Sequence, residues 1–131
     1  MTATKIKVLI VEDDSLIALS LSEALVMAGY EVTGSAATIA EALNLAQRLH
    51  PDLAIIDIRL PGPEDGITGA NLLRQSLSLP IIFLTGEIDP LIRKRAAAIS
   101  SAAVLTKPVP VEMVIKAIES AIEKDALSIA S

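Results

Sequence analysis

The residues best suited to chemistry in this chain are three acids and a lysine, each next to an apolar run. Glu12 and Asp13 follow the first run, Asp57 ends the second, and Lys107 follows a third. A carboxylate can act as a nucleophile, and carboxylate oxygens without His or Cys are ligands that suit Mg²⁺. An ammonium group beside them supplies a point charge for phosphoryl oxygens. Together these groups are the parts of a phosphoryl-transfer site.

The apolar runs predict strands that alternate with helices along the whole chain. The predicted strands are residues 6–11, 30–34, 53–58, 81–85 and 103–106, and the predicted helices are 15–28, 38–49, 67–77, 90–99 and a last one from 111. Alternation of this kind predicts an α/β fold, in which a parallel sheet has helices on both faces. Ligands of such sheets bind beyond the carboxyl ends of the strands. Thr85 is the last residue of the predicted strand 81–85. Its hydroxyl should therefore lie at the same edge of the sheet as the acids and the lysine.

Composition narrows the class of protein. The chain has 131 residues, of which 52% are hydrophobic and 2% aromatic, so it should form one domain with an aliphatic core. It has no cysteine, which excludes disulfides, thiolate catalysis and cysteine-based zinc sites. Its net charge of −5 argues against nucleic-acid binding, and no apolar stretch is long enough for a signal peptide or a membrane span. We expect a soluble, cytoplasmic protein.

The chain resembles the receiver domain of two-component response regulators over essentially its whole length. Four segments carry the resemblance, in the expected order and at the expected spacing. They are 8–14 (VLIVEDD), 55–62 (IIDIRLPG), 80–85 (PIIFLT) and 105–108 (LTKP). The resemblance implies a flavodoxin-like, doubly wound sheet of five parallel strands in the order 2-1-3-4-5, with five helices in three layers. The receiver domain would cover residues 1–125, and a short tail would cover 126–131.

The resemblance also implies roles for individual residues. Asp57 would accept a phosphoryl group from a phosphohistidine on a sensor histidine kinase or a histidine phosphotransferase. Lys107 would contact the phosphoryl group and precede a cis peptide bond to Pro108, and Thr85 would move towards the phosphoryl oxygen. The Mg²⁺ ligands would be Glu12, Asp13, Asp57 and the backbone carbonyl of Arg59. Such a protein signals through protein contacts and is not a turnover enzyme, apart from its own phosphorylation and slow dephosphorylation.

Two features of the sequence concern the lifetime of the phosphoryl group and the way in which phosphorylation would be transmitted to a partner. Arg59 lies two residues after Asp57 and Glu87 lies two residues after Thr85, on neighbouring strand ends. We predict that Arg59 and Glu87 approach each other and limit attack by water on the phosphoryl group. Receiver domains usually carry an aromatic side chain three residues before the lysine, and this chain has Val104 there, whose β-branched side chain is stiff.

Three alternatives remain open from the sequence. A degenerate receiver would act as a scaffold without phosphorylation. A flavodoxin-like cofactor binder would need a phosphate loop rich in Gly, Ser and Thr after the first strand, where this chain has acids. An aspartyl phosphatase would need a second acid two residues after its nucleophile, where this chain has Arg59. The sequence names neither the kinase nor the downstream target, and it leaves homodimerisation through the last two helices open.

Overall fold

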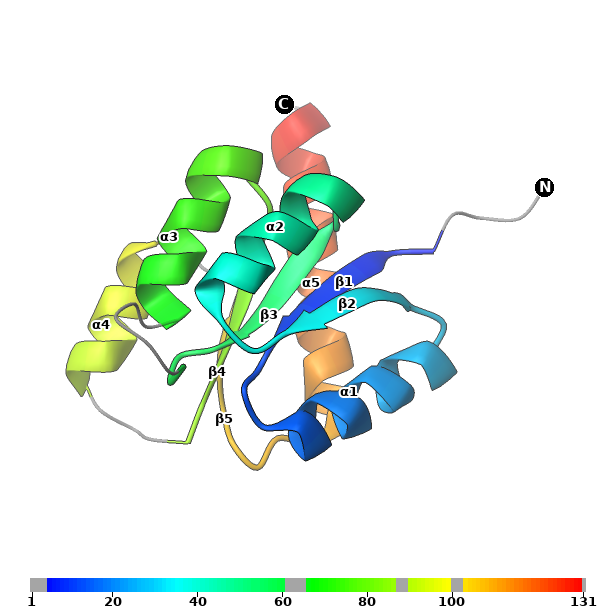
Figure 1. Cartoon of the computed structure of the whole chain (residues 1–131). Helices are drawn as coiled ribbons and strands as arrows, with labels where there is room; N and C mark the ends of the chain where they lie inside the picture. The colour runs from blue at the N-terminus through cyan, green and yellow to red at the C-terminus, as the bar shows by residue number, and fades with distance from the viewer. Residues whose placement is uncertain (1–4, 61–65, 87–89, 100–102, 131) are drawn as a thin grey trace.

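A computed structural model describes residues 5–60, 66–86, 90–99 and 103–130, and of 125–130 it describes the backbone alone. Strands and helices alternate from end to end (Figure 1). The strands are β1 (Lys7–Val11), β2 (Glu31–Ala36), β3 (Leu53–Asp57), β4 (Ile81–Thr85) and β5 (Ala103–Thr106). The helices are α1 (Ser15–Met27), α2 (Ile39–Leu49), α3 (Gly66–Leu77), α4 (Pro90–Ala98) and α5 (Val111–Ala130).

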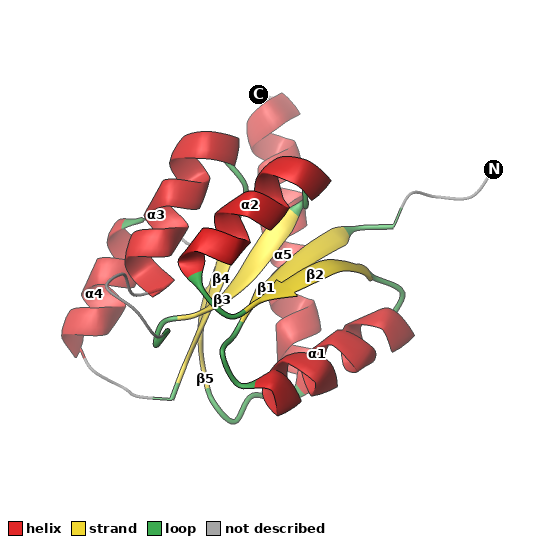
Figure 2. Ribbon diagram, in the orientation of Figure 1, coloured by secondary structure: helices red, strands yellow, loops and turns green. Residues whose placement is uncertain are grey.

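The five strands form one parallel sheet in the order β2-β1-β3-β4-β5, which confirms the predicted topology. Helices α2, α3 and α4 cover one face of the sheet, and α1 and α5 cover the other (Figure 2). The predicted three layers are therefore present. None of the described helices is both long and apolar enough to cross a membrane.

The central strands explain why the sheet is built this way. Every residue of β3 is buried, and its side chains alternate between two cores. Ala54 and Ile56 pack in the core under α2 and α3, whereas Leu53 and Ile55 pack in the core under α1 and α5. A strand that is apolar on both faces is stable only in the middle of a sheet with helices on both sides. This position brings the polar end of β3 to the centre of one sheet edge.

The start of the first helix follows from side-chain capping. The Asp14 carboxylate oxygen Oδ1 accepts hydrogen bonds from the backbone N–H groups of Leu16 and Ile17, at 3.0 and 3.2 Å. Such a cap satisfies donors that have no partner within the helix. The cap sets the direction in which α1 leaves β1, immediately after Glu12 and Asp13.

The last helix is longer than the sequence predicted. Residues 126–130 were predicted to be a tail, but α5 continues through them to Ala130. No glycine or proline follows Pro110, so nothing in the sequence stops this helix. Strand β2 also ends two residues later than predicted, at Ala36, which lies opposite Val11, the last residue of β1.

Candidate functional site

The register of the sheet brings four strand ends to one edge. Val11 lies opposite Ile56 in β3, and Asp57 lies opposite Leu84 in β4. Thr85, the last residue of β4, lies opposite Thr106 at the end of β5. Apart from Val104, which lies within β5, each candidate residue is thus either the last residue of its strand or one of the two that follow. Parallel strands end at the same edge of a sheet, which is why residues far apart in the sequence meet here.

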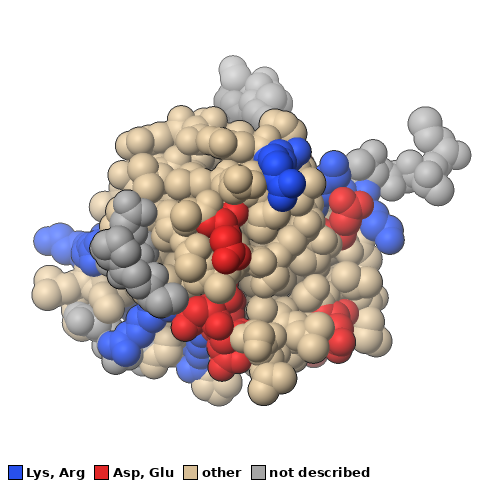
Figure 3. Space-filling view, viewed as in Figure 1, with Lys and Arg blue, Asp and Glu red and all other residues tan. Residues whose placement is uncertain are grey.

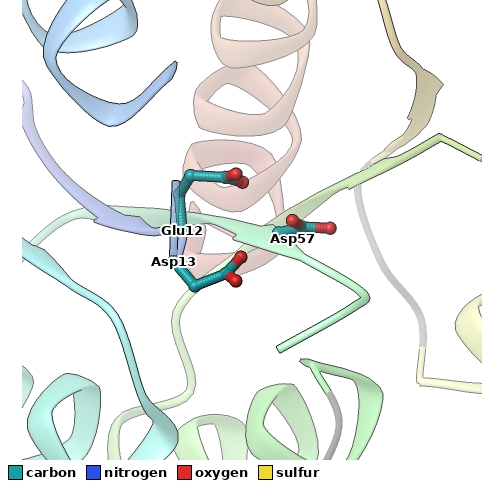
Figure 4. A group of neighbouring side chains, drawn as sticks. All are labelled: Glu12, Asp13 and Asp57. Carbon is teal, nitrogen blue, oxygen red and sulfur yellow. The ribbon is translucent and has the colours of Figure 1, made fainter. Parts of the chain in front are cut away.

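Three carboxylates lie side by side at this edge (Figure 4). One oxygen from each of Glu12, Asp13 and Asp57 lies within 4.8 Å of the others. Glu12 and Asp57 are each only 5% exposed, whereas Asp13 is exposed. Oxygen donors of this kind suit a divalent cation such as Mg²⁺, which keeps several waters and takes few protein ligands. The donor set therefore fits Mg²⁺, and the exposed side of the site leaves room for its waters.

Lys107 connects two of these carboxylates. Its Nζ donates to Asp57 Oδ2 at 3.0 Å and to the two Glu12 carboxylate oxygens at 3.1 and 3.3 Å. Burial lowers the pKa of the Lys107 amine, but the hydrogen bonds and charges of Asp57 and Glu12 outweigh burial and raise it overall. Lys107 is therefore a fixed positive charge between two buried acids. Figure 3 shows acidic and basic side chains close together on the lower part of the face in view.

The carboxyl group of Glu12 has a strongly raised pKa. Burial, together with the nearby carboxylate of Asp57, raises the pKa of the Glu12 carboxyl to about 7, against the lowering effect of Lys107. Two acids this close cannot both ionise freely when one is desolvated. In the metal-free protein at neutral pH, the Glu12 carboxyl is therefore partly protonated.

The Asp57 carboxylate is held at both of its oxygens. Oδ2 accepts from Lys107, and Oδ1 accepts from the backbone N–H of Arg59 at 3.0 Å. Because one donor is a backbone group, the orientation of the carboxylate depends on the main chain that directly follows β3. The Arg59 side chain is exposed. Glu87 lies outside the described residues, so its predicted approach to Arg59 remains a prediction.

The remaining predicted residues are placed on β4, on β5 and just beyond. Thr85 is 1% exposed, and its carbonyl accepts from the backbone N–H of Lys107 at 2.8 Å. The predicted cis peptide bond between Lys107 and Pro108 is present. Val104 is half-buried, lies opposite Phe83 in β4 and packs against the core under α2 and α3. The sequence reasoning missed the contact between Lys107 and the Thr85 carbonyl, because backbone hydrogen bonds leave no sequence signal.

An apolar groove of about 600 Å³ lies beside Lys107, and it was not predicted from the sequence. Leu16, Ile17 and Leu21 line it from α1, and Pro108 and Val109 line it from the other side. The groove joins the polar edge of the sheet to the surface of α1. The site therefore has a charged part at the strand ends, and beside it an apolar groove between α1 and the segment that follows Lys107.

Comparison with known proteins agrees with this geometry. The response regulator receiver domain family matches residues 8–119. The transcriptional regulatory protein PdtaR of Mycobacterium tuberculosis is 37% identical over 118 residues, which are 90% of this chain and 57% of PdtaR. A protein-glutamate methylesterase/protein-glutamine glutaminase of Archaeoglobus fulgidus is 32% identical over 104 residues, which are 78% of this chain and 30% of that protein. The chain thus spans 57% of the one relative and 30% of the other.

Solved structures give the same result for the fold. The signal receiver domain of a modulated diguanylate cyclase from Desulfovibrio desulfuricans superposes with a TM-score of 0.90 at 38% identity, covering 95% of this chain and 99% of that chain. The chemotaxis protein CheY4 of Vibrio cholerae superposes with a TM-score of 0.83 at 33% identity, covering 90% of this chain and 99% of that chain. Family match, identity and fold together show that this chain belongs to the response regulator receiver domain family of two-component systems.

Proposed function

We propose that Asp57 accepts a phosphoryl group from a phosphohistidine on a sensor histidine kinase or a histidine phosphotransferase. The observation that carries the proposal is the lysine bridge at a buried carboxylate: Lys107 Nζ lies 3.0 Å from Asp57 Oδ2 and 3.1 Å from Glu12 Oε2. A carboxylate nucleophile beside a fixed ammonium group is an arrangement that suits phosphoryl transfer. The protein would then signal through contacts with other proteins.

The bonding changes of the step involve few groups of this chain. One Asp57 carboxylate oxygen attacks phosphorus as the bond from phosphorus to the histidine nitrogen breaks, and the departing imidazole keeps that electron pair. Lys107 turns from the carboxylate towards a phosphoryl oxygen, and the Thr85 hydroxyl can donate to another. The Arg59 N–H keeps the carboxyl group in place, since it contacts Oδ1 rather than the oxygen held by Lys107.

The cation has a defined place in this proposal. Glu12, Asp13 and Asp57 would hold Mg²⁺, together with the backbone carbonyl of Arg59, which the family resemblance adds to the set. Mg²⁺ would neutralise charge on the phosphoryl oxygens. Glu12 must give up its proton for this role, so the raised pKa of its carboxyl makes cation binding weaker below neutral pH.

Intact-mass measurement tests the proposal. Wild-type protein is incubated with Mg²⁺ and a small phosphodonor such as acetyl phosphate, and we expect it to gain one phosphoryl group. The gain should be absent in Asp57→Asn and in wild type with EDTA. Asp52→Asn is a matched control, since Asp52 is an exposed acid at the opposite end of β3, where its carboxylate accepts from the Lys7 N–H at 2.7 Å. Wild-type protein that gains no phosphoryl group from acetyl phosphate or phosphoramidate would instead support the unphosphorylated scaffold.

A further inference from the structure

The main chain that follows the phosphoacceptor is held from two sides. The Ile58 N–H donates to the carbonyl of Leu84 in β4 at 2.9 Å. The Ile58 carbonyl accepts from the N–H of Gly66, the first residue of α3, at 2.8 Å. Ile58 is therefore fixed between a strand and the start of a helix, and it is the residue that joins Asp57 to Arg59.

Gly66 leaves no room for a side chain. A Cβ atom there would overlap the carbonyl oxygen of Asp57 and lie 2.8 Å from Ile58 Cα. Both obstacles are backbone atoms, so neither can move aside by a change of rotamer. Any other residue at position 66 must push the start of α3 away from the end of β3, and this movement breaks the hydrogen bond from Gly66 to Ile58.

We infer that Gly66 is a positioning residue for the phosphoacceptor site. The Arg59 N–H orients Asp57 Oδ1 at 3.0 Å, and Arg59 directly follows Ile58, which Leu84 holds at its N–H and Gly66 holds at its carbonyl. The inference rests on the proposed function, in which the Arg59 carbonyl is also a ligand of Mg²⁺. A side chain at position 66 would thus disturb both the direction of the carboxylate and one expected metal ligand, although Gly66 has no side chain that could bind either group.

Gly69 provides a matched control within the same helix. A Cβ at Gly69 would overlap the Cδ1 atom of Ile39 and lie 2.8 Å from its Cγ1. This crowding falls on the end of a side chain of α2, in the core between α2 and α3. Gly66→Ala and Gly69→Ala both place an alanine in a crowded position of α3, but only Gly66→Ala displaces the backbone next to Asp57.

The test compares these two variants with wild type in three measurements. They are the Mg²⁺ dissociation constant by calorimetry on unphosphorylated protein, the rate of phosphorylation by acetyl phosphate at saturating Mg²⁺, and stability in urea. We expect Gly66→Ala to weaken Mg²⁺ binding about tenfold and to slow phosphorylation about 10- to 100-fold, since a displacement of about 1 Å can cost that much. Gly69→Ala should lose stability yet keep both other values within about twofold.

The outcomes separate this inference from the proposed function. Wild type that neither binds Mg²⁺ nor becomes phosphorylated would contradict the proposed function. If wild type is functional, two results would overturn the role of Gly66. One is that Gly66→Ala and Gly69→Ala change Mg²⁺ binding and the phosphorylation rate equally, and the other is that Gly66→Ala changes neither. If Gly66→Ala is unfolded in buffer, all three proteins are measured in trimethylamine N-oxide, which favours folded states. The positioning role would also be overturned if Gly66→Ala stayed unfolded in trimethylamine N-oxide while Gly69→Ala was folded. In that case Gly66 would be required for folding as a whole.

Discussion

Replacing Glu12 by Gln should stabilise the metal-free protein, and the gain should increase with pH. Burial and the nearby Asp57 raise the pKa of the Glu12 carboxyl from 4.5 to about 7, so the folded protein holds this proton more tightly than the unfolded chain does. Stability from the protonated carboxyl is fully present below pH 4.5 and is lost as the pH rises through about 7. Gln cannot ionise, so the variant does not suffer this loss.

The structure sets the size of the effect. The interval between pKa values of 4.5 and about 7 corresponds to about 3 kcal/mol, at 1.36 kcal/mol per pKa unit, which is an upper limit for the gain at pH 8. Linkage predicts that the gain grows by about 2 kcal/mol between pH 5 and pH 8. The comparison isolates ionisation, because Gln has nearly the shape of a protonated Glu and keeps an acceptor oxygen for Lys107.

Urea unfolding in EDTA measures this gain at pH 5, 6, 7 and 8. Far-ultraviolet circular dichroism is the suitable signal, since the chain has no tryptophan. Glu123→Gln is the control, because Glu123 is exposed on α5 and its replacement removes the same charge far from the site. A surface substitution of this kind should change stability by no more than about 0.5 kcal/mol at any pH.

Two results would refute the reasoning. One is a gain for Glu12→Gln of equal size at pH 5 and pH 8, which would separate the stabilisation from ionisation. The other is a variant less stable than wild type at pH 8, which would mean that the hydrogen bonds from Lys107 outweigh the cost of burying an ionised Glu12. EDTA is essential to both, because a bound cation would favour the ionised carboxylate and hide the effect.

Three further predictions concern the core, the cation and the phosphoryl lifetime. Phe83→Ala should lower the free energy of unfolding by about 3–5 kcal/mol in urea, because Phe83 is fully buried in β4. Mg²⁺ at ten times its dissociation constant should stabilise wild type by about 1.4 kcal/mol in thermal unfolding, and Asp13→Asn should lose most of this gain. Glu87→Ala should speed dephosphorylation by up to about fivefold, since exposed ion pairs contribute about 0–1 kcal/mol. An unchanged rate would contradict the predicted pairing with Arg59.

The sequence predicted the strand ends well because their signals are local. Each of β1, β3 and β4 is an apolar run that stops at a polar residue, and burial on both faces demands such runs. Once the chain is read as one parallel sheet with the strand order that the family resemblance implies, Glu12, Asp57 and Lys107 come together at a single edge. Their meeting could therefore be predicted without knowing any distance.

Other features depend on contacts that composition does not encode. Helix α1 has apolar residues on all sides, so its periodicity cannot show which face is buried. In the structure Ala18 and Leu25 are buried, whereas Leu19 is 56% exposed and Met27 is 89% exposed. The close approach of Gly66 to Asp57 was equally hidden, since one glycine in a loop rich in glycine and proline does not reveal which backbone it meets.

Because the strands are paired in a fixed register, the positions of the functional side chains depend on the length of each strand. Val11 lies opposite Ile56 and Thr85 lies opposite Thr106, so each functional side chain is placed by the number of residues in its own strand. Deleting one residue within β3 would draw Asp57 back by about 3.3 Å and turn its side chain to the opposite face of the sheet. A flexible loop loses only about 0.6 kcal/mol when its length doubles. The site should therefore tolerate long insertions in loops away from this edge far better than the loss of one residue from β3.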